Sequence, residues 1–334
     1  MIDLNLPEML NENDMVVHDI AKNLSIEESR ILRLLRASRS IGLVEFPESS
    51  NHLVRATEAL RLLRHSLLGP LITSRGITTY SAWNRLSNAL VSSKTAFELH
   101  HDMRIGEYIE EGCTIENASN ERCKAQKSVR DRIHNKREMC HSIFQSTLRA
   151  IPWNQFIAER RAMTVCDVGS GDQTSDLGVT IESIFHQQSD VRVHGIAFDL
   201  PHVLDRGVLQ KDEFERVEGN LFSSVPSADV YLLKHILHAG DDETCLQILR
   251  VIENSLRRDG VIVVVDQVLD ENSSTSGHQY LEDMNLFVTG GGRDRTVSEW
   301  QILFEKSRFE VLHIEIGSNS FCSSSAIILK RRAV

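Results

Sequence analysis

The chain has 334 residues, of which 41% are hydrophobic and 25% are charged. This length allows two domains, and the composition is ordinary for a folded globular protein. Acidic residues outnumber basic residues by 47 to 37, which gives a net charge of −10. A chain with this excess of acid is poorly suited to binding a polyphosphate backbone, so we expect no nucleic-acid partner.

Cysteine spacing and apolar runs exclude further classes of protein. The six cysteines form no CxxC pair, which argues against a zinc site or a disulfide framework and predicts a reducing compartment. No apolar run approaches the roughly 18 residues that a membrane span needs, and the N-terminus has no basic-then-apolar signal. We therefore expect a cytoplasmic protein without a membrane partner.

Residues 1–140 are mostly helical in pattern and are predicted to form one domain. Within them, residues 12–46 are typical of a helix-turn-helix with a following wing. Ser25 and Glu28 have the spacing of a capping box, and Gly42 stands where a helix would end. The stretch then turns strongly polar near its end, which marks the expected inter-domain region.

A row of basic residues in this domain leaves two interpretations open. Arginines recur every third residue at Arg30, Arg33, Arg36 and Arg39. The row fits contact with DNA, but in so acidic a chain we favour a solvated or subunit-facing side of a helix.

From Met163 onwards, short apolar runs alternate with helical segments. Six runs are predicted to be strands, at residues 164–168, 191–200, 228–237, 260–269, 309–316 and 324–330. Continuous apolar strands separated by helices are typical of a parallel sheet covered on both faces. We therefore predict an α/β fold with a doubly wound, Rossmann-like domain at residues 141–334.

A glycine turn in residues 164–204 is the first pattern that indicates a ligand. Gly169 and Gly171 would let the backbone approach a ligand at the carboxyl end of a strand. The dinucleotide fingerprint GxGxxG needs a glycine at position 174, where Thr174 stands. The pattern therefore does not favour a dinucleotide.

Two acids frame this turn. Asp167 precedes the glycines and suits a ligand ammonium group, whereas Asp199 ends the second strand and can accept hydrogen bonds from both ribose hydroxyls. The alternative for Asp199 is an acid that caps a helix or a loop. Taken together, the two acids predict a nucleoside ligand with a cationic tail, such as S-adenosylmethionine.

Two further clusters carry candidate catalytic groups. A strand runs into Lys234 and His238, and imidazole is the side chain best matched to proton transfer near neutral pH. Lys234 is either a partner for a ligand carboxylate or a surface lysine, and His238 is either catalytic or structural. Further on, Asp294 follows the glycines 290–292 and either orients a catalytic histidine or belongs to a helix start. That helix start has a capping box at Thr296.

The chain resembles the small-molecule O-methyltransferases of the hydroxyindole and caffeic acid type over roughly residues 12–330. The motifs that carry the resemblance are DVGSG at 167–171, FDLPHVL at 198–204, SVPSADVYLLKHILH at 224–238 and GGGRDRT at 290–296. The resemblance implies the class I methyltransferase fold, an N-terminal winged-helix dimerisation domain and a homodimer.

The resemblance also implies roles for individual residues. S-adenosylmethionine is the expected methyl donor, and a small hydroxylated, aromatic molecule is the expected acceptor. His238 is the expected general base, oriented by Asp294. The expected cofactor-binding residues are Asp167, Gly169, Gly171, Asp199, Leu200, Asn220, Leu221 and Lys234.

Two other hypotheses remain open because the motifs depart from the family pattern. Ala239 and Gly240 follow His238 where the family has Asp-Trp, which motivates a protein that binds S-adenosylmethionine but catalyses an isomerisation or a cyclisation. Gln173 and Asn220 replace a glycine and an acid, which motivates a non-catalytic homologue.

Overall fold

The computed structural model describes residues 1–334 except residues 12, 48–51, 65–67, 70–71, 73–75, 77–78, 111–141, 158–160, 172–174, 186, 188–190, 205–213, 271–276, 318–323 and 334. The chain divides into two compact units. One contains residues 1–81 and 106–139, and the other contains residues 82–105 and 140–334. The domain boundary expected between residues 140 and 141 lies outside the described residues.

The N-terminal unit is a small winged helix. Its elements are α1 (Leu6–Met9), β1 (Met15–Val16), α2 (Val17–Leu24), α3 (Glu28–Ser40), β2 (Val44–Glu45), β3 (Leu53–Ala56) and α4 (Glu58–Leu62). Strand β3 pairs antiparallel with both β1 and β2. The helices pack on this sheet through buried apolar side chains that include Val17, Ile20, Ile31, Leu35, Val54 and Leu60.

The turn between α2 and α3 differs from the predicted capping box. Ser25 ends α2 in the left-handed conformation, with φ 54°, and Glu27 precedes α3 without a side-chain cap. The prediction was wrong because Ser25 ends α2 and lies two residues before Glu27, which takes the N-cap position of α3. Gly42 does follow the end of α3, with φ 76°.

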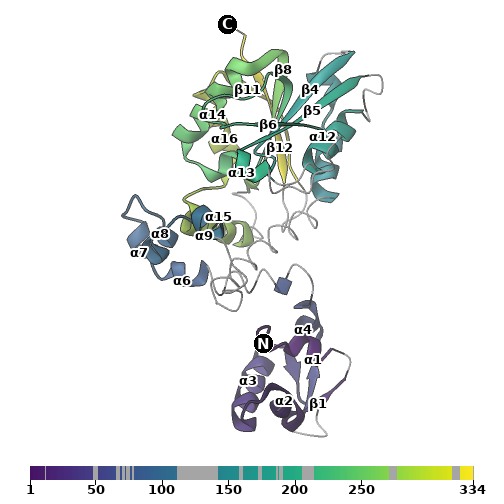
Figure 1. The fold of residues 1–334 in the computed structure, drawn as a ribbon, viewed down its shortest axis with the longest axis vertical. Coiled ribbons are helices and arrows are strands. Elements are labelled where there is room, and N and C mark those ends of the chain that lie inside the picture. The colour runs from purple at the N-terminus through teal and green to yellow at the C-terminus, as the bar shows by residue number, and fades with distance from the viewer. Residues whose placement is uncertain are drawn as a thin grey trace. The chain divides into compact units, whose positions relative to one another are not determined.

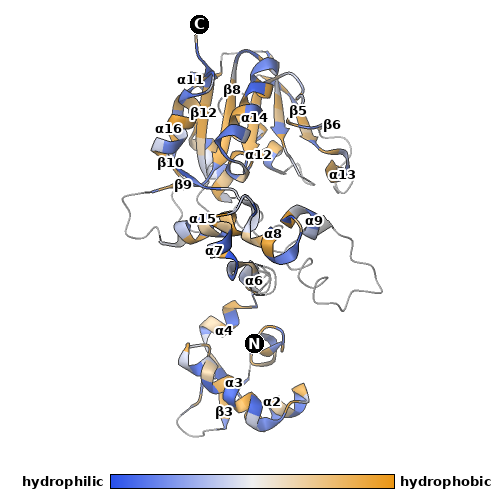
Figure 2. Cartoon of the chain, turned by 90° about the vertical axis from the view of Figure 1, so that its left-hand side faces the viewer, coloured by the Kyte–Doolittle hydropathy of each residue, from blue (hydrophilic) through white to orange (hydrophobic). Residues whose placement is uncertain are grey.

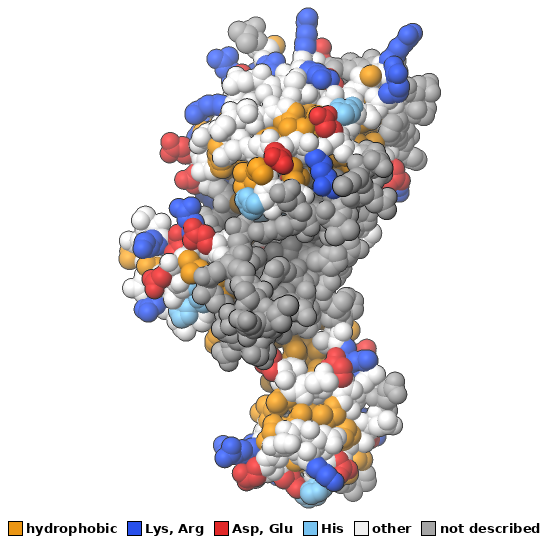
Figure 3. All heavy atoms as spheres, in the orientation of Figure 1, with side chains coloured by type: hydrophobic (Ala, Val, Ile, Leu, Met, Phe, Trp, Pro, Cys, Tyr) orange, Lys and Arg blue, Asp and Glu red, His pale blue; other side chains and the backbone are white. Residues whose placement is uncertain are grey.

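The arginine row on α3 is exposed to solvent. Arg30 lies 3.3 Å from Glu27. On the face shown in Figure 3, acidic and basic side chains are interspersed over the N-terminal unit. This exposure fits both interpretations of the row, the solvated or subunit-facing helix side and the contact with DNA.

A seven-stranded sheet forms the centre of the C-terminal unit (Figure 1). Its strands are β4 (Ala162–Val168), β5 (Arg192–Asp199), β6 (Glu215–Glu218), β7 (Ala228–Lys234), β8 (Leu256–Asp266), β11 (Phe309–Glu315) and β12 (Ser325–Arg331). The order is β11-β12-β8-β7-β4-β5-β6, with β11 and β12 antiparallel to their neighbours and the other five strands parallel. The order reverses at β4, and such a reversal is where open α/β sheets bind ligands.

All six predicted strands are present, and the sheet contains one that the sequence did not predict. Strand β6 has the sequence Glu-Arg-Val-Glu and lies at the edge of the sheet. It has no apolar run because three of its four side chains are exposed. An edge strand of this kind gives no hydrophobic pattern.

Helices cover both faces of the sheet, as the continuous apolar strands predicted. Helices α14 (Asp242–Ser255) and α16 (Val297–Glu305) pack on one face, and α12 (Ser175–Phe185) and α11 (Trp153–Phe156) pack on the other. Side chains of the inner strands alternate between the two cores: Tyr231 of β7 belongs to the first core and Leu232 to the second. Figure 2 shows the strands as largely hydrophobic.

A further group of helices in the C-terminal unit comes from residues 82–105 and from the segment after β9. It contains α7 (Leu86–Ala89), α8 (Ala96–His101) and α15 (Gly277–Gly290), of which α8 contacts both others. The remaining elements are α6 (Tyr80–Trp83), α9 (Ile105–Glu110), α13 (Pro201–Leu204), the 3₁₀ helix η3 (Leu237–Ala239), β9 (Val268–Leu269) and β10 (Arg295–Thr296). In the described part of the chain, no helix has both the length and the apolar character that crossing a bilayer requires.

Candidate active site

The predicted site residues gather at the carboxyl ends of the central parallel strands. Strand β4 ends just before the glycine turn, its neighbours β5 and β7 end at Asp199 and Lys234, and β8, the next strand after β7, ends at Asp266. Because these strands are parallel, their carboxyl ends lie at one edge of the sheet. The two halves of the predicted site, cofactor residues and catalytic residues, therefore share this edge.

The glycine turn folds back onto the end of β5. Gly169 and Gly171 have φ values of 73° and 72°, which favour glycine. The Gly169 N–H donates to the Phe198 carbonyl at 2.8 Å, and a Cβ on Gly169 would lie 2.5 Å from the Cδ1 atom of Ile236. A side chain at position 169 would collide with Ile236 and would be strained at this φ, so the turn favours glycine there. Gln173 and Thr174 lie outside the described residues.

Asp199 holds the glycine turn against β5. Its Oδ2 atom accepts the Gly171 N–H at 2.8 Å, and its Oδ1 atom accepts the N–H of the exposed Leu200 at 2.7 Å. A carboxylate has about four acceptor positions, so this half-buried group keeps capacity for ligand hydroxyls. The two interpretations of Asp199, as a loop acid and as a ribose acceptor, are thus compatible.

Asp167 and Asn220 occupy different surroundings at this edge. Asp167 is buried in β4, in register between Ala197 and Leu232, so its negative charge favours a nearby cation. Asn220 is exposed, and its Oδ1 atom accepts the Phe222 N–H at 2.9 Å.

The segment after β6 is tied to β5. The Gly219 N–H donates to the Asp199 carbonyl at 3.0 Å, and Leu221 packs against the core. Asn220 and Leu221 therefore lie beside the end of β5.

Lys234 is a paired and largely buried cation. Its Nζ atom lies 2.7 Å from Oδ1 of Asp176, at the start of α12, and 4.2 Å from the ring centroid of Phe144. Only 10% of the lysine side chain is exposed, so it is not a surface lysine. An ammonium group has three donors, of which Asp176 uses one.

His238 lies in η3 and faces two carboxylates. Its Nδ1 atom is 3.5 Å from Oδ1 of Asp294 and 3.6 Å from Oδ1 of Asp266. The structure therefore brings the predicted pair His238 and Asp294 together. Both distances exceed a normal hydrogen bond, and catalytic hydrogen bonds are often long before substrate binds.

Asp266 is a site residue that the sequence analysis missed. It ends β8, is 0% exposed, and both of its carboxylate oxygens lack a hydrogen-bond partner among the described residues. The Nδ1 atom of His235 lies 3.4 Å from its Oδ1 atom, and the two imidazole rings are 5.1 Å apart between centroids. The available signal was an acid at the end of a buried strand, at the same sheet edge as His238.

The loop after α15 fixes Asp294 next to the histidine. The Arg293 N–H donates to the His238 carbonyl at 2.8 Å, and a Cβ on Gly292 would lie 2.4 Å from that carbonyl oxygen. The Asp294 N–H donates to Asp283 at 2.7 Å, and Gln267 donates to Oδ2 of Asp294 at 3.1 Å. The other Asp294 oxygen faces His238.

Arg295 holds η3 in place through hydrogen bonds. It is 0% exposed and donates to the carbonyls of Leu237 and Gly240 at 3.2 and 3.1 Å. It also lies 3.0 Å from Asp242 and 5.0 Å from the Trp300 ring. Arg295, which the sequence analysis did not single out, supports the backbone that carries His238.

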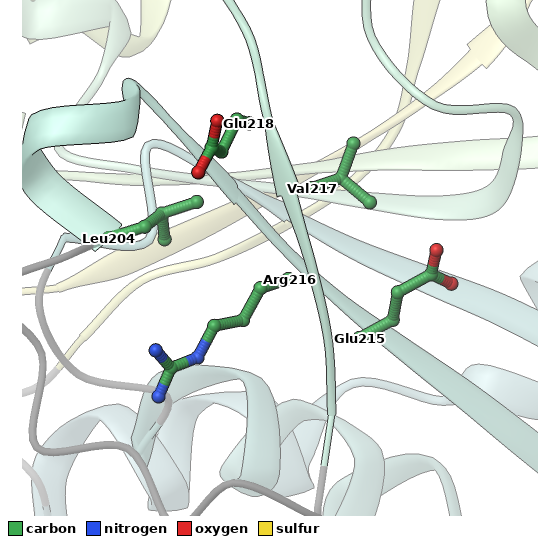
Figure 4. A pocket seen from close by; sticks show the side chains of 5 residues that line it. All are labelled: Leu204, Glu215, Arg216, Val217 and Glu218. Atoms are coloured by element: carbon green, nitrogen blue, oxygen red, sulfur yellow. The ribbon is translucent and has the colours of Figure 1, made fainter.

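A pocket lies over the edge strand β6 (Figure 4). It is lined by Leu204, Glu215, Arg216, Val217 and Glu218. This lining includes none of the predicted site residues. We therefore base the assignment of the site on the residues at the carboxyl ends of the strands.

Comparisons with known proteins agree with this fold and these motifs. The O-methyltransferase domain family matches residues 134–310, which is more than half of the chain. O-methyltransferase 7 of Dictyostelium discoideum is 34% identical over 142 residues, and the match covers 42% of this chain and 40% of that protein. The match thus spans less than half the length of that relative.

A second relative and a solved structure match more of the chain. Myricetin 3-O-methyltransferase 3 of Solanum habrochaites is 26% identical over 88% of this chain and 77% of that protein. The structure of mitomycin 7-O-methyltransferase MmcR has a TM-score of 0.77 at 21% identity, over 99% of this chain and 92% of that chain. The predicted fold class and family are confirmed. The chain belongs to the O-methyltransferase family, whose methyl donor is S-adenosylmethionine.

Proposed function

We propose that this chain transfers a methyl group from S-adenosylmethionine to a hydroxyl of a small aromatic molecule, with His238 as the general base. The observation that carries the proposal is the position of His238, whose Nδ1 atom faces the carboxylates of Asp294 and Asp266. A relative that covers most of the chain is named for methylation of a hydroxyl, which supports this acceptor class.

The residues at the glycine turn fit this cofactor. Gly169 and Gly171 turn the backbone with positive φ at the carboxyl end of β4, where a ligand is expected, and Asp199 has acceptor capacity for ribose hydroxyls. The buried charge of Asp167 suits the cationic amino-acid end, and Lys234 can bind its carboxylate with the donors that Asp176 does not use. Leu200, Asn220 and Leu221 would hold the adenine. When bound, S-adenosylmethionine supplies a methyl group on a sulfonium, which is an electrophile.

His238 would prepare the acceptor hydroxyl. With a proton on Nδ1 directed at the carboxylates, Nε2 keeps a lone pair and can take the hydroxyl proton. A phenol with a pKa near ~10 is largely neutral at pH 7, so this transfer makes the oxygen a better nucleophile. Asp294 and Asp266 would then stabilise the imidazolium, and the loop that holds Asp294 would keep the ring aligned.

The test is formation of S-adenosylhomocysteine with a panel of phenols and hydroxylated heteroaromatics. We expect turnover in the natural chain and a loss of about 10²–10⁴-fold in His238→Gln, because general base catalysis contributes that much. Binding of the cofactor, measured by calorimetry, should not change in the variant. Unchanged turnover in His238→Gln contradicts the role of the base. Product formed without S-adenosylhomocysteine would indicate an isomerisation or cyclisation instead, and absence of cofactor binding a non-catalytic homologue.

We also propose that the chain functions as a homodimer. The resemblance implies this assembly, and the adjacent side chains of Leu90 and Val91 are 65% and 88% exposed at the end of α7. This exposed apolar pair is the surface that we propose a second copy of the chain covers.

A further inference from the structure

We propose that His235, His238 and Asp266 form a binding site for a divalent transition-metal cation, with zinc as the representative ion. One ligand atom from each residue can be chosen so that all three lie within 4.8 Å of one another. The Nδ1 atoms of His235 and His238 lie 3.4 and 3.6 Å from the same Asp266 oxygen. Tetrahedral zinc with bonds of about 2.0–2.1 Å holds its ligand atoms roughly 3.3 Å apart, which is close to the spacing of each histidine nitrogen from Asp266.

The state of Asp266 is a second, independent observation for this site. The carboxylate is fully buried, and neither oxygen has a hydrogen-bond partner among the residues that the structure describes. A buried charge in this state is unfavourable unless a cation or donor compensates it. Oδ1 of Asp294 is also buried without such a partner and lies 3.5 Å from Nδ1 of His238, which places a fourth donor beside the site.

The donor set determines which cation fits. Two imidazole nitrogens with one or two carboxylate oxygens suit zinc, cobalt and other first-row divalent ions, whereas magnesium and calcium prefer oxygen ligands alone. The backbone places the second imidazole here, because His235 adopts a left-handed conformation with φ 56° and donates its N–H to Val265 at 3.0 Å. Cysteine spacing, which predicted no zinc site, carries no information about this cluster.

The cation would compete with the proposed catalysis, and this part of the inference rests on the proposed function. As a general base, His238 carries its proton on Nδ1 and accepts a second proton on Nε2. A cation on Nδ1 leaves the neutral imidazole with its proton on Nε2, so that nitrogen can no longer accept one. Bound cation should therefore inhibit methyl transfer.

The direct test titrates chelator-treated, full-length protein with cobalt(II) and follows the visible absorption of the bound ion. We expect one cobalt per chain, displaced by zinc. His235→Asn should weaken binding by at least the roughly 10–100-fold that loss of a supporting partner costs at metal sites. Asparagine tolerates the left-handed backbone at this position, so the variant removes the ligand without new strain. The matched control is His194→Asn, because His194 is an exposed histidine paired with Glu215 elsewhere in the sheet.

Several results would overturn the proposal. These are absence of cobalt absorption and equal affinity in His235→Asn and the natural chain. In the activity assay, zinc should inhibit the natural chain and not His235→Asn, and zinc that binds without inhibiting would overturn the placement on Nδ1. If the protein transfers no methyl group at all, the cobalt titration still decides whether the site exists. Failure of the proposed function is therefore distinguishable from failure of the site.

Discussion

At the scale of single residues, the site depends on charged groups that the fold keeps from water. Asp266 and Asp294 are buried and face Nδ1 of His238, and Arg295 is buried and donates to the Leu237 carbonyl in η3. Arg295 is compensated by carbonyls and Asp242, and Asp294 by Gln267 and a histidine, whereas Asp266 faces His235 and His238 at longer distances. Removing one partner of a buried set leaves the others without compensation. The single-residue predictions follow from this.

Substitution of Asp294 should affect the rate more than binding. Asp294→Asn keeps the shape but removes the charge that faces Nδ1 of His238. We expect the kcat for methyl transfer to fall about tenfold or more, with the Kd for S-adenosylmethionine unchanged. Asp294→Glu, which restores the charge, should recover much of the rate. A rate that is low in both variants, with a normal melting temperature, would contradict an orienting role for the charge.

Substitution of Arg295 should affect stability. Arg295→Met leaves the carbonyls of Leu237 and Gly240 without a donor, and each orphaned acceptor costs about 1–3 kcal/mol. We expect the free energy of unfolding in urea to fall by at least about 2 kcal/mol. The control is Arg293→Met, whose exposed side chain also pairs with Asp242. Its loss should stay below about 1 kcal/mol, and equal losses would contradict the supporting role of Arg295.

At the scale of elements, the ends of the helices decide how the site is held. Helix α14 begins directly after η3, and its N-cap residue Asp241 accepts the Thr244 N–H at 2.8 Å. Helix α16 begins with a capping box at Thr296 and Glu299, which the sequence predicted correctly. The two caps lie three residues after His238 and two residues after Asp294. The starts of α14 and α16 therefore help to hold the backbone of both residues in place.

The cap of α14 gives a pH dependence of stability. Hydrogen bonds from Thr244, through its side chain and its N–H, hold the pKa of Asp241 below its usual value. Because the folded state has the lower pKa, the cap stabilises the fold above the ordinary value of ~3.9 and is lost as the pH falls below it. Asp241→Asn still caps the helix but does not titrate. The free energy of unfolding in urea should fall less steeply between pH 6 and pH 3 in this variant than in the natural chain. An equal fall in both would rule out Asp241 as a contributor to the pH dependence.

At the scale of the whole molecule, the sequence predicted the parallel sheet and the family, because apolar strands and local motifs are written in consecutive residues. It did not predict β6, whose exposed side chains give no pattern, or the left-handed Ser25. It also missed Asp266, because the contact with His238 joins residues 28 positions apart, one at the end of β8 and one in η3. Patterns within a segment were therefore readable, and contacts between segments were not.

Assembly is the prediction at this scale. Light scattering should give a mass of twice the 37.8 kDa of one chain. Val91→Asp places a charge on the exposed apolar end of α7 and should shift the mass toward that of a monomer. Ile302→Asp is the control, because Ile302 is 51% exposed on α16. A dimer that persists in Val91→Asp would place the interface elsewhere, and a monomeric natural chain would contradict the homodimer.

The missing side chain at Gly292 has a mechanical consequence. In the loop after α15, the backbone of Gly292 lies close to the carbonyl of His238, and the Arg293 N–H donates to the same carbonyl oxygen. The backbone that carries the imidazole is thus connected to the end of α15 as well as to the sheet. We expect a tilt of α15 to shift His238 as well. A ligand or a second chain that contacts α15 would then also change the alignment of the general base.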